Sequence, residues 1–136
     1  MAGRDTGGNL DSWVVPLRSL RMTDVHHVGG KNASLGELLG QLTALGLRVP
    51  DGFATTADAY RAFLAQDGLA GRIDAALSRL DVDDVEQLAR TGREIRRWIT
   101  EAPLPQRLVD DLTGAWQQMA AAHAGELAVS VRSSAT

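Results

Sequence analysis

Apolar residues recur at three- and four-residue intervals through much of the chain, and this helical period limits the possible folds more than any other feature. The first long run of this kind is made by five leucines: Leu35, Leu38, Leu39, Leu42 and Leu45. Gly46 follows as the expected end of that helix. Later runs predict four more helices, at residues 60–64, 73–80, 85–99 and 108–119.

Sequence typical of β-strands is confined to short stretches. Residues 13–17 are mostly apolar and include Pro16, and a short extended piece is expected at Phe53. Leu127, Val129 and Val131 alternate with Ala, Ser and Arg, which predicts a strand near the end of the chain. So few strands leave sheet edges unpaired. The sequence therefore predicts an α+β fold, rich in helix, with a small and incomplete sheet.

Aromatic side chains are few, and they are expected in the core. The helix expected at residues 60–64 should bury one stripe, made by Tyr60, Phe63 and Leu64. Thr55 or Thr56 is expected to cap the N-terminus of this helix. Trp98 and Trp116 fall on or beside apolar helical faces, which favours core packing over ligand binding.

Composition excludes several classes of function. A net charge of −3 in 136 residues offers no field for nucleic acid or for an anionic membrane. The chain has no cysteine, which excludes disulfides and a thiol nucleophile. The start is polar and no apolar run approaches the ~20 residues that cross a bilayer. We expect a soluble cytoplasmic chain whose residues 1–12 form a flexible tail.

Two clusters of charged or ligating residues have simple explanations. Arginines at positions 90, 93, 96 and 97 follow acidic residues on one expected helix, and this order complements the helix dipole. His26 and His27 are adjacent and lack a third ligand at suitable spacing, so we expect no metal site.

Gly29, Gly30 and Lys31 stand immediately before the first long helix. Glycine lets a backbone come close to a ligand, and the N–H groups at a helix start attract phosphate. Lys31 adds a mobile positive charge. The motif is not a Walker A loop, because the glycine spacing and the Lys-Ser/Thr pair are missing. Taken alone, the motif favours an ordinary turn that carries a surface lysine.

A second candidate motif is Arg132-Ser133-Ser134, after the strand expected at residues 127–131. A planar guanidinium beside hydroxyl donors suits the oxygens of a polyphosphate. The alternative is an arginine on the polar face of an edge strand.

Four stretches in order resemble the start of phosphoenolpyruvate synthases: residues 28–38, 49–60, 95–99 and 131–136. The resemblance runs from about Trp13 to the last residue. It is more specific than any single motif, because all four stretches occur in the family's order.

The resemblance implies that residues 13–136 are the N-terminal part of an ATP-binding domain, a partial ATP-grasp-like lobe truncated at its C-terminus. These enzymes convert ATP, pyruvate and water into phosphoenolpyruvate, AMP and phosphate. By the resemblance, Lys31 and Arg132 contact ATP phosphates, with Gly29, Gly30, Ser133 and Ser134 as weaker candidates. The Mg²⁺ ligands, the phosphorylated histidine and the pyruvate site belong to parts that this chain does not contain, so no catalytic residue is assigned.

Other functions stay open at this point. Rifampicin phosphotransferases and pyruvate, phosphate dikinases share this lobe, and a catalytically inert helical interaction module is a further alternative. Pyruvate would be a partner only of the intact enzyme, which can be homo-oligomeric in this family. The 136-residue chain alone is expected to have no turnover.

Overall fold

The computed structural model describes residues 11–136, which fold into two compact units. The first contains the residues up to Tyr60 together with Gln106–Thr136, and the second contains Arg61–Pro105. The first unit holds β1 (Val14–Pro16), η1 (Leu17–Ser19), η2 (Met22–Asp24), α1 (Val25–Val28), α2 (Gly30–Ala44), β2 (Phe53–Thr55) and α6 (Gln106–Ala121). The second holds η3 (Gln66–Gly68), α4 (Leu69–Ser78) and α5 (Val85–Glu101), and α3 (Ala57–Leu64) runs across the boundary.

The strands β1 and β2 form a two-stranded antiparallel sheet in the first unit. Val14 pairs with Thr55, Val15 with Ala54, and Pro16 with Phe53. Backbone hydrogen bonds continue the pairing at both ends, from the Leu17 N–H to the Gly52 carbonyl and from the Thr56 N–H to the Trp13 carbonyl, both at 3.0 Å.

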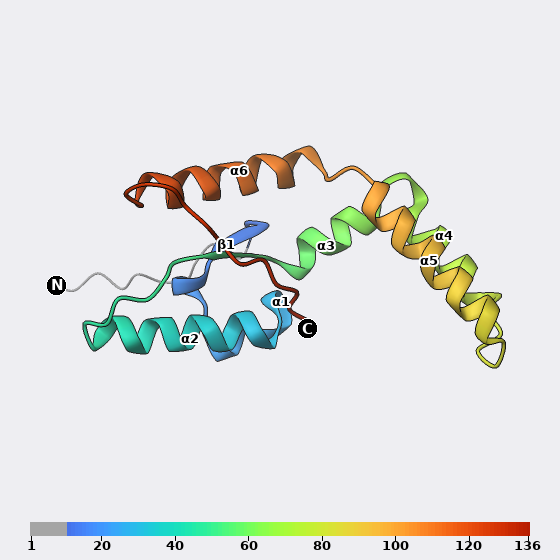
Figure 1. Ribbon diagram of the computed structural model, residues 1–136, viewed down its shortest axis with the longest axis horizontal. Helices are drawn as coiled ribbons and strands as arrows, with labels where there is room; N and C mark the ends of the chain where they lie inside the picture. Colours follow the sequence, from blue (N-terminus) through green and yellow to red (C-terminus); the bar gives the residue numbers. More distant parts are fainter. Residues whose placement is uncertain (1–10) are drawn as a thin grey trace. The chain divides into compact units, whose positions relative to one another are not determined.

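The two faces of this sheet are covered by different helices, because successive strand residues point to opposite sides. Val15 belongs to a core cluster with Leu17, Leu20, Val28, Ala33, Leu39 and Ala54, on the side of α2. Val14 packs with Ala59 and Leu108 on the side of α6. The first unit is therefore a thin sheet between α2 and α6, and both ribbon views show this layering (Figure 1).

Helix α2 lies unusually close to the turn of η1 because Gly36 carries no side chain. A Cβ at this position would lie 2.5 Å from the Cβ of Leu20 and 2.6 Å from the Leu17 carbonyl oxygen. The packing of α2 against η1 and Leu20 therefore requires glycine at position 36.

The second unit is built around the helices α4 and α5. Gly68 has a left-handed backbone at the start of α4, and the Asp84 carboxylate caps α5 by accepting a hydrogen bond from the Gln87 N–H at 3.0 Å. The Gln66 side-chain amide donates to the Pro103 carbonyl at 2.9 Å, which joins η3 to the end of α5.

Most of the predicted elements are confirmed, including the α+β class and the small sheet. The helix from Gly30, the extended piece at Phe53 and the cap at Thr56, whose hydroxyl accepts from the Ala59 N–H at 3.3 Å, all occur. The ATP-grasp-like part of the expectation stays a prediction. The prediction of a tail at residues 1–12 falls almost wholly outside the described residues.

The strand predicted at residues 127–131 is wrong for this structure. After α6 no helix or strand is formed up to Thr136, and the Val131 side chain is 93% exposed. The reason is physical: an alternating sequence becomes a strand only beside a partner, and β1 and β2 pair with each other over three residues.

Two expected core aromatics are also corrected. Tyr60 is 56% exposed, because the buried face of α3 runs through Ala59 and Phe63; the prediction that Phe63 is buried is confirmed. Trp116 is 40% exposed, and α6 instead uses Leu108 as its buried contact. Within residues 11–136, no helix is both long enough and apolar enough to span a membrane.

Replacing Gly36 with alanine should destabilise the first unit, whereas the same change at Gly40 should not. The new methyl group at position 36 would overlap a backbone carbonyl, at a cost of roughly 1–3 kcal/mol in unfolding free energy. At position 40 the nearest atoms belong to the Arg21 side chain at 3.5 Å, so Gly40→Ala should stabilise the helix by about 0.5–1 kcal/mol. Urea denaturation followed by circular dichroism compares the two, and equal effects would contradict the packing described.

Candidate functional site

The candidate site is built at the junction between α1 and α2. Gly29 separates the two helices with φ of +82°, a value that favours glycine. Its N–H donates to the Val25 carbonyl at 2.8 Å, and its carbonyl accepts from the Ala33 N–H at 3.1 Å. The Asn32 side-chain amide donates to the Val28 carbonyl at 2.9 Å, which further fixes the junction.

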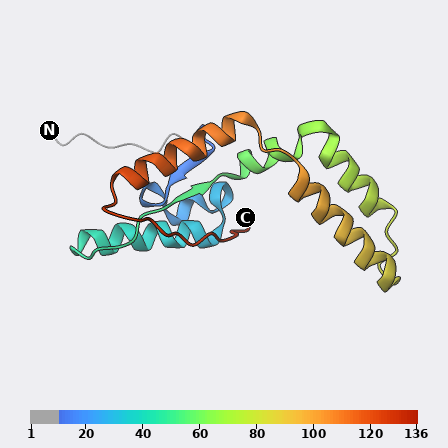
Figure 2. The ribbon, with the colours of Figure 1, turned by 45° about the horizontal axis from the view of Figure 1, so that its top comes forward.

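The last residues of the chain return to this junction. The Gly30 N–H donates to the Ala135 carbonyl at 3.1 Å, and the Asn32 N–H donates to the Ser134 hydroxyl oxygen at 3.3 Å. Figure 2 shows the end of the chain beside the start of α2. We call these five residues (Gly29, Gly30, Asn32, Ser134 and Ala135) the clasp.

Gly29 is required at the clasp for a second reason besides its backbone angle. A Cβ there would lie 2.3 Å from the Ser134 hydroxyl oxygen and 2.6 Å from the Ala135 carbonyl oxygen. The close approach that glycine permits is therefore an approach of the chain's own residues 134 and 135. This differs from the sequence interpretation, in which the glycine makes room for a ligand.

The clasp also changes the interpretation of the N–H groups at the start of α2. Two of them, at Gly30 and Asn32, are already bonded to residues 134 and 135. Among the described residues, the Lys31 N–H has no hydrogen-bond acceptor. The anion-binding capacity of this helix start is therefore reduced to one free N–H and the side chains around it.

Lys31 and Arg132 belong to the two segments that the clasp joins. Lys31 lies between the two bonded residues of α2, and Arg132 precedes Ser134 by two residues. Both side chains are exposed, and neither makes a hydrogen bond or an ion pair with another described residue. The structure thus brings together the two segments predicted from opposite ends of the sequence.

The electrostatic setting of these two cations is simple. Residues 25–36 and 127–136 contain no aspartate or glutamate, whereas they include the basic residues Lys31 and Arg132. The nearest acidic side chain before α1, Asp24, accepts a hydrogen bond from the Arg21 N–H at 2.8 Å. The two segments of the clasp therefore present positive charge without an internal counter-ion.

The two serines predicted as weaker candidates differ in their burial. Ser133 is exposed, whereas Ser134 is half-buried in the clasp. Asn32, which sequence reasoning did not select, contributes both its backbone and its side chain; an asparagine in the first turn of a helix is a recognisable signal for such local bonding.

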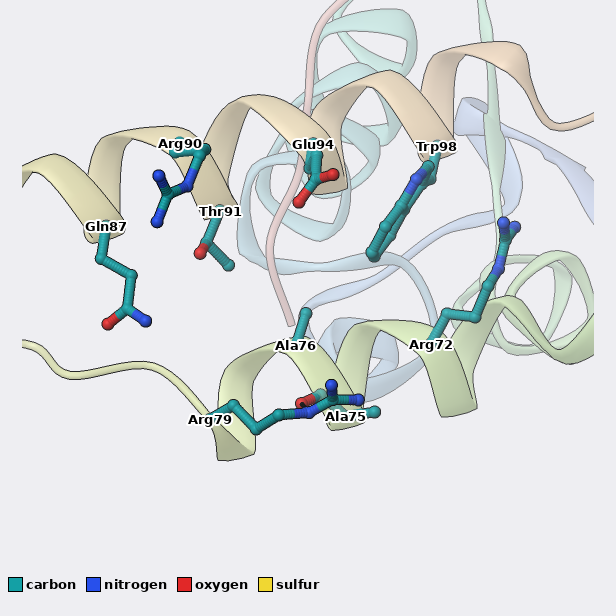
Figure 3. A pocket seen from close by; sticks show the side chains of 9 residues that line it. All are labelled: Arg72, Ala75, Ala76, Arg79, Gln87, Arg90, Thr91, Glu94 and Trp98. Carbon is teal, nitrogen blue, oxygen red and sulfur yellow. Dashed lines mark hydrogen bonds between the residues drawn. The ribbon is translucent and has the colours of Figure 1, made fainter.

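An open hollow of about 320 Å³ lies between α4 and α5 in the second unit, and Figure 3 shows the side chains that line it. Two of its three arginines make contacts within the unit: the Arg72 guanidinium lies 5.3 Å from the centre of the Trp98 ring, and Arg79 Nε donates to the Ala75 carbonyl at 3.2 Å. None of the site residues predicted from the sequence lines this hollow.

Metal-ligating residues do not gather in the described part of the chain. The rings of His26 and His27 stand 5.6 Å apart, edge to face. Within residues 11–136, no group of three or more histidine, cysteine, aspartate or glutamate side chains could hold a metal ion.

Comparison with known proteins identifies the class to which this fold and this junction belong. Residues 25–136, which include both segments of the clasp, match the family described as pyruvate phosphate dikinase, AMP/ATP-binding domain. The chain belongs to this family.

Individual relatives narrow the comparison further. A protein named phosphoenolpyruvate synthase from Neisseria meningitidis serogroup B is 58% identical over 127 residues, covering 93% of this chain and 16% of that protein. Proteins of the same name from Pseudomonas aeruginosa and Escherichia coli are 56% and 48% identical and cover 91% and 90% of the chain. The chain spans about a sixth of the length of these relatives.

The two neighbouring glycines of the junction should respond very differently to substitution. Gly29→Ala introduces both a backbone angle that alanine avoids and an overlap with residues 134 and 135, and it should cost roughly 1–3 kcal/mol. Gly30→Ala meets no atom within 4 Å and should change stability by less than about 0.5 kcal/mol.

Hydrogen exchange of the Asn32 amide gives the specific measurement. Its exchange should accelerate in Gly29→Ala and stay unchanged in Gly30→Ala. The same exchange rate in both variants would show that residues 134 and 135 do not depend on Gly29.

Proposed function

We propose that residues 13–136 are the N-terminal part of the ATP-binding domain of a phosphoenolpyruvate synthase, and that Lys31 and Arg132 bind the phosphates of ATP. The observation that carries the proposal is the clasp. It joins the start of α2 to the segment of residues 132–135. The hydrogen bond between Asn32 and Ser134 links residues that are 102 positions apart in the sequence. The segments that contain Lys31 and Arg132 are thereby joined in the first unit.

The chemistry of phosphoryl transfer agrees with this assignment. Such reactions need correct positioning of the nucleotide and neutralisation of its negative charge more than covalent participation by the protein. A lysine supplies a mobile point charge, and an arginine supplies a planar group that can bind two phosphate oxygens at once. Two free cations beside segments without carboxylates provide what a triphosphate requires.

The weaker candidates take different roles in the proposal. The exposed Ser133 hydroxyl and the free Lys31 N–H are the additional donors available to a phosphate oxygen. The Gly29 and Gly30 backbones are occupied by the clasp, so we assign them no direct contact with the nucleotide.

The name shared by the relatives favours phosphoenolpyruvate synthase over the other enzymes that contain this lobe. On this proposal the intact enzyme is cytoplasmic and makes phosphoenolpyruvate, AMP and phosphate from ATP, pyruvate and water. Pyruvate binding and the phosphorylated histidine belong to other regions of that enzyme, and the proposal includes a homo-oligomeric intact enzyme. An ATP-grasp-like arrangement of the complete domain is part of the same proposal, which includes neither nucleic acid nor membrane as a partner.

Magnesium enters the proposal only as the ion that accompanies ATP. The described residues do not provide a group of ligands that fits it. We therefore assign no step to the metal, and the work of this segment is to bind and orient the phosphates.

Removing either cation should weaken ATP binding by the purified chain. Lys31→Ala and Arg132→Ala should each raise the Kd for Mg-ATP at least about tenfold, because each loses a charge-assisted contact. Arg48→Ala is the matched control, since Arg48 is also exposed but follows the opposite end of α2. Calorimetric titration measures all four chains.

The pattern across these variants decides the proposal. Equal losses in all three variants would indicate non-specific attraction of charge, and unchanged affinity in Lys31→Ala and Arg132→Ala would remove both residues from the site. The unsubstituted chain should show no pyruvate-dependent release of AMP and phosphate.

A further inference from the structure

We propose that Ser134 is a positioning residue that fastens the segment carrying Arg132 beside Lys31, and that it does not itself bind the nucleotide. This inference rests on the proposed function for its purpose, but its structural part stands on the clasp alone. It gives different roles to two adjacent serines that the sequence does not distinguish. Ser133 is available to bind the ligand, whereas Ser134 holds the segment in place.

The contacts of Ser134 show that its side chain is bonded to the start of α2. Its hydroxyl oxygen accepts the hydrogen bond from the Asn32 N–H at 3.3 Å, and it lies 2.3 Å from where a Cβ on Gly29 would stand. The neighbouring Ala135 carbonyl accepts from the Gly30 N–H at 3.1 Å. The Ser134 side chain thus points into the α1–α2 junction and bonds to the helix that carries Lys31.

Lys31 lies between the two residues that donate these hydrogen bonds. Gly30 and Asn32, on either side of Lys31, are the two residues that donate to residues 134 and 135. Arg132 is only two residues before Ser134, and two residues of chain span at most about 7 Å. Holding Ser134 therefore restricts where the Arg132 backbone can lie relative to Lys31.

In the described chain, residues 132–135 have few contacts other than those of the clasp. Between α6 and Thr136 there is no helix or strand in the described chain, and Val131 is almost fully exposed. Ser133 is exposed and makes no hydrogen bond with another described residue. The clasp is thus the contact that orders residues 132–135, and without it Arg132 would sample many positions.

This restraint matters for binding because ordering a flexible segment costs conformational entropy. A site whose cations are already held near each other does not lose that entropy when the ligand arrives. We expect the Ser134 hydroxyl to raise affinity for a triphosphate through this preorganisation.

The structural part can be tested without any nucleotide. The chain has no cysteine, so Lys31→Cys/Arg132→Cys introduces the only two thiols for spin labels. Pulsed electron resonance should give a narrow distance peak in this background. Adding Ser134→Ala should abolish the narrow peak, while Ser133→Ala, the matched control, should retain it. A narrow peak that survives Ser134→Ala overturns the proposal.

The functional part uses Mg-ATP as the probe on chains without labels. Ser134→Ala should raise the Kd about fivefold, the equivalent of one ordinary hydrogen bond, with little change in the thermal unfolding midpoint of the second unit. Ser134→Thr keeps the hydroxyl and should recover part of the affinity, which a general loss of packing would not explain.

The two measurements fail separately. If the labelled Lys31→Cys/Arg132→Cys chain shows the narrow peak but the unsubstituted chain does not bind Mg-ATP, the proposed function is wrong and the nucleotide purpose of Ser134 is overturned with it. If it binds Mg-ATP and Ser134→Ala leaves both the distance peak and the Kd unchanged, the positioning role is overturned and the proposed function stands. Loss of both the peak and the affinity in Ser134→Ala alone supports the inference.

Discussion

The close approach of residues 134 and 135 to Gly29 is the contact on which the candidate site depends. It is short enough to exclude every side chain at position 29, and it satisfies two of the N–H groups that a helix start leaves without partners. The Ser134 hydroxyl oxygen and the Ala135 carbonyl accept from two helix N–H groups and thus take the place of the anion that such a helix start would otherwise attract. Phosphate binding, in consequence, has to rely on side-chain cations beside the clasp.

That contact is useful only because α2 is itself held rigidly. Its other glycine contact, at Gly36, brings the helix against η1, and Ala33 and Leu39 pack it onto the Val15 face of the sheet. The opposite face of the same three-residue strand is covered by α6 through Val14 and Leu108. One small sheet therefore orders both the helix that carries Lys31 and the helix that leads into the segment of Arg132. Sites on rigid elements hold their geometry better than sites on free loops.

Much of this architecture could be predicted from sequence because it is local. Helical periodicity located α2 and α5, and glycine identified the left-handed position after α2. The absence of a strand at residues 127–131 could not be predicted, since strand formation depends on a pairing partner and not on alternation alone. The same limit applies to the site: Lys31 and Arg132 were found as motifs, but the bond from Asn32 to Ser134 spans 102 residues and leaves no local pattern. Nothing in the sequence separates Ser133 from Ser134, whereas burial does.

Mapping Mg-ATP binding residue by residue tests the central claim most directly. In a titration of the isotopically labelled chain, backbone amide shifts should concentrate at residues 29–33 and at residues 132–135, because the nucleotide phosphates are proposed to bind where these segments meet. Residues 69–101, which contain α4, α5 and the hollow between them, should be unaffected. Shifts confined to residues 69–101, or absent from one of the two clasp segments, would contradict a phosphate site built from Lys31 and Arg132.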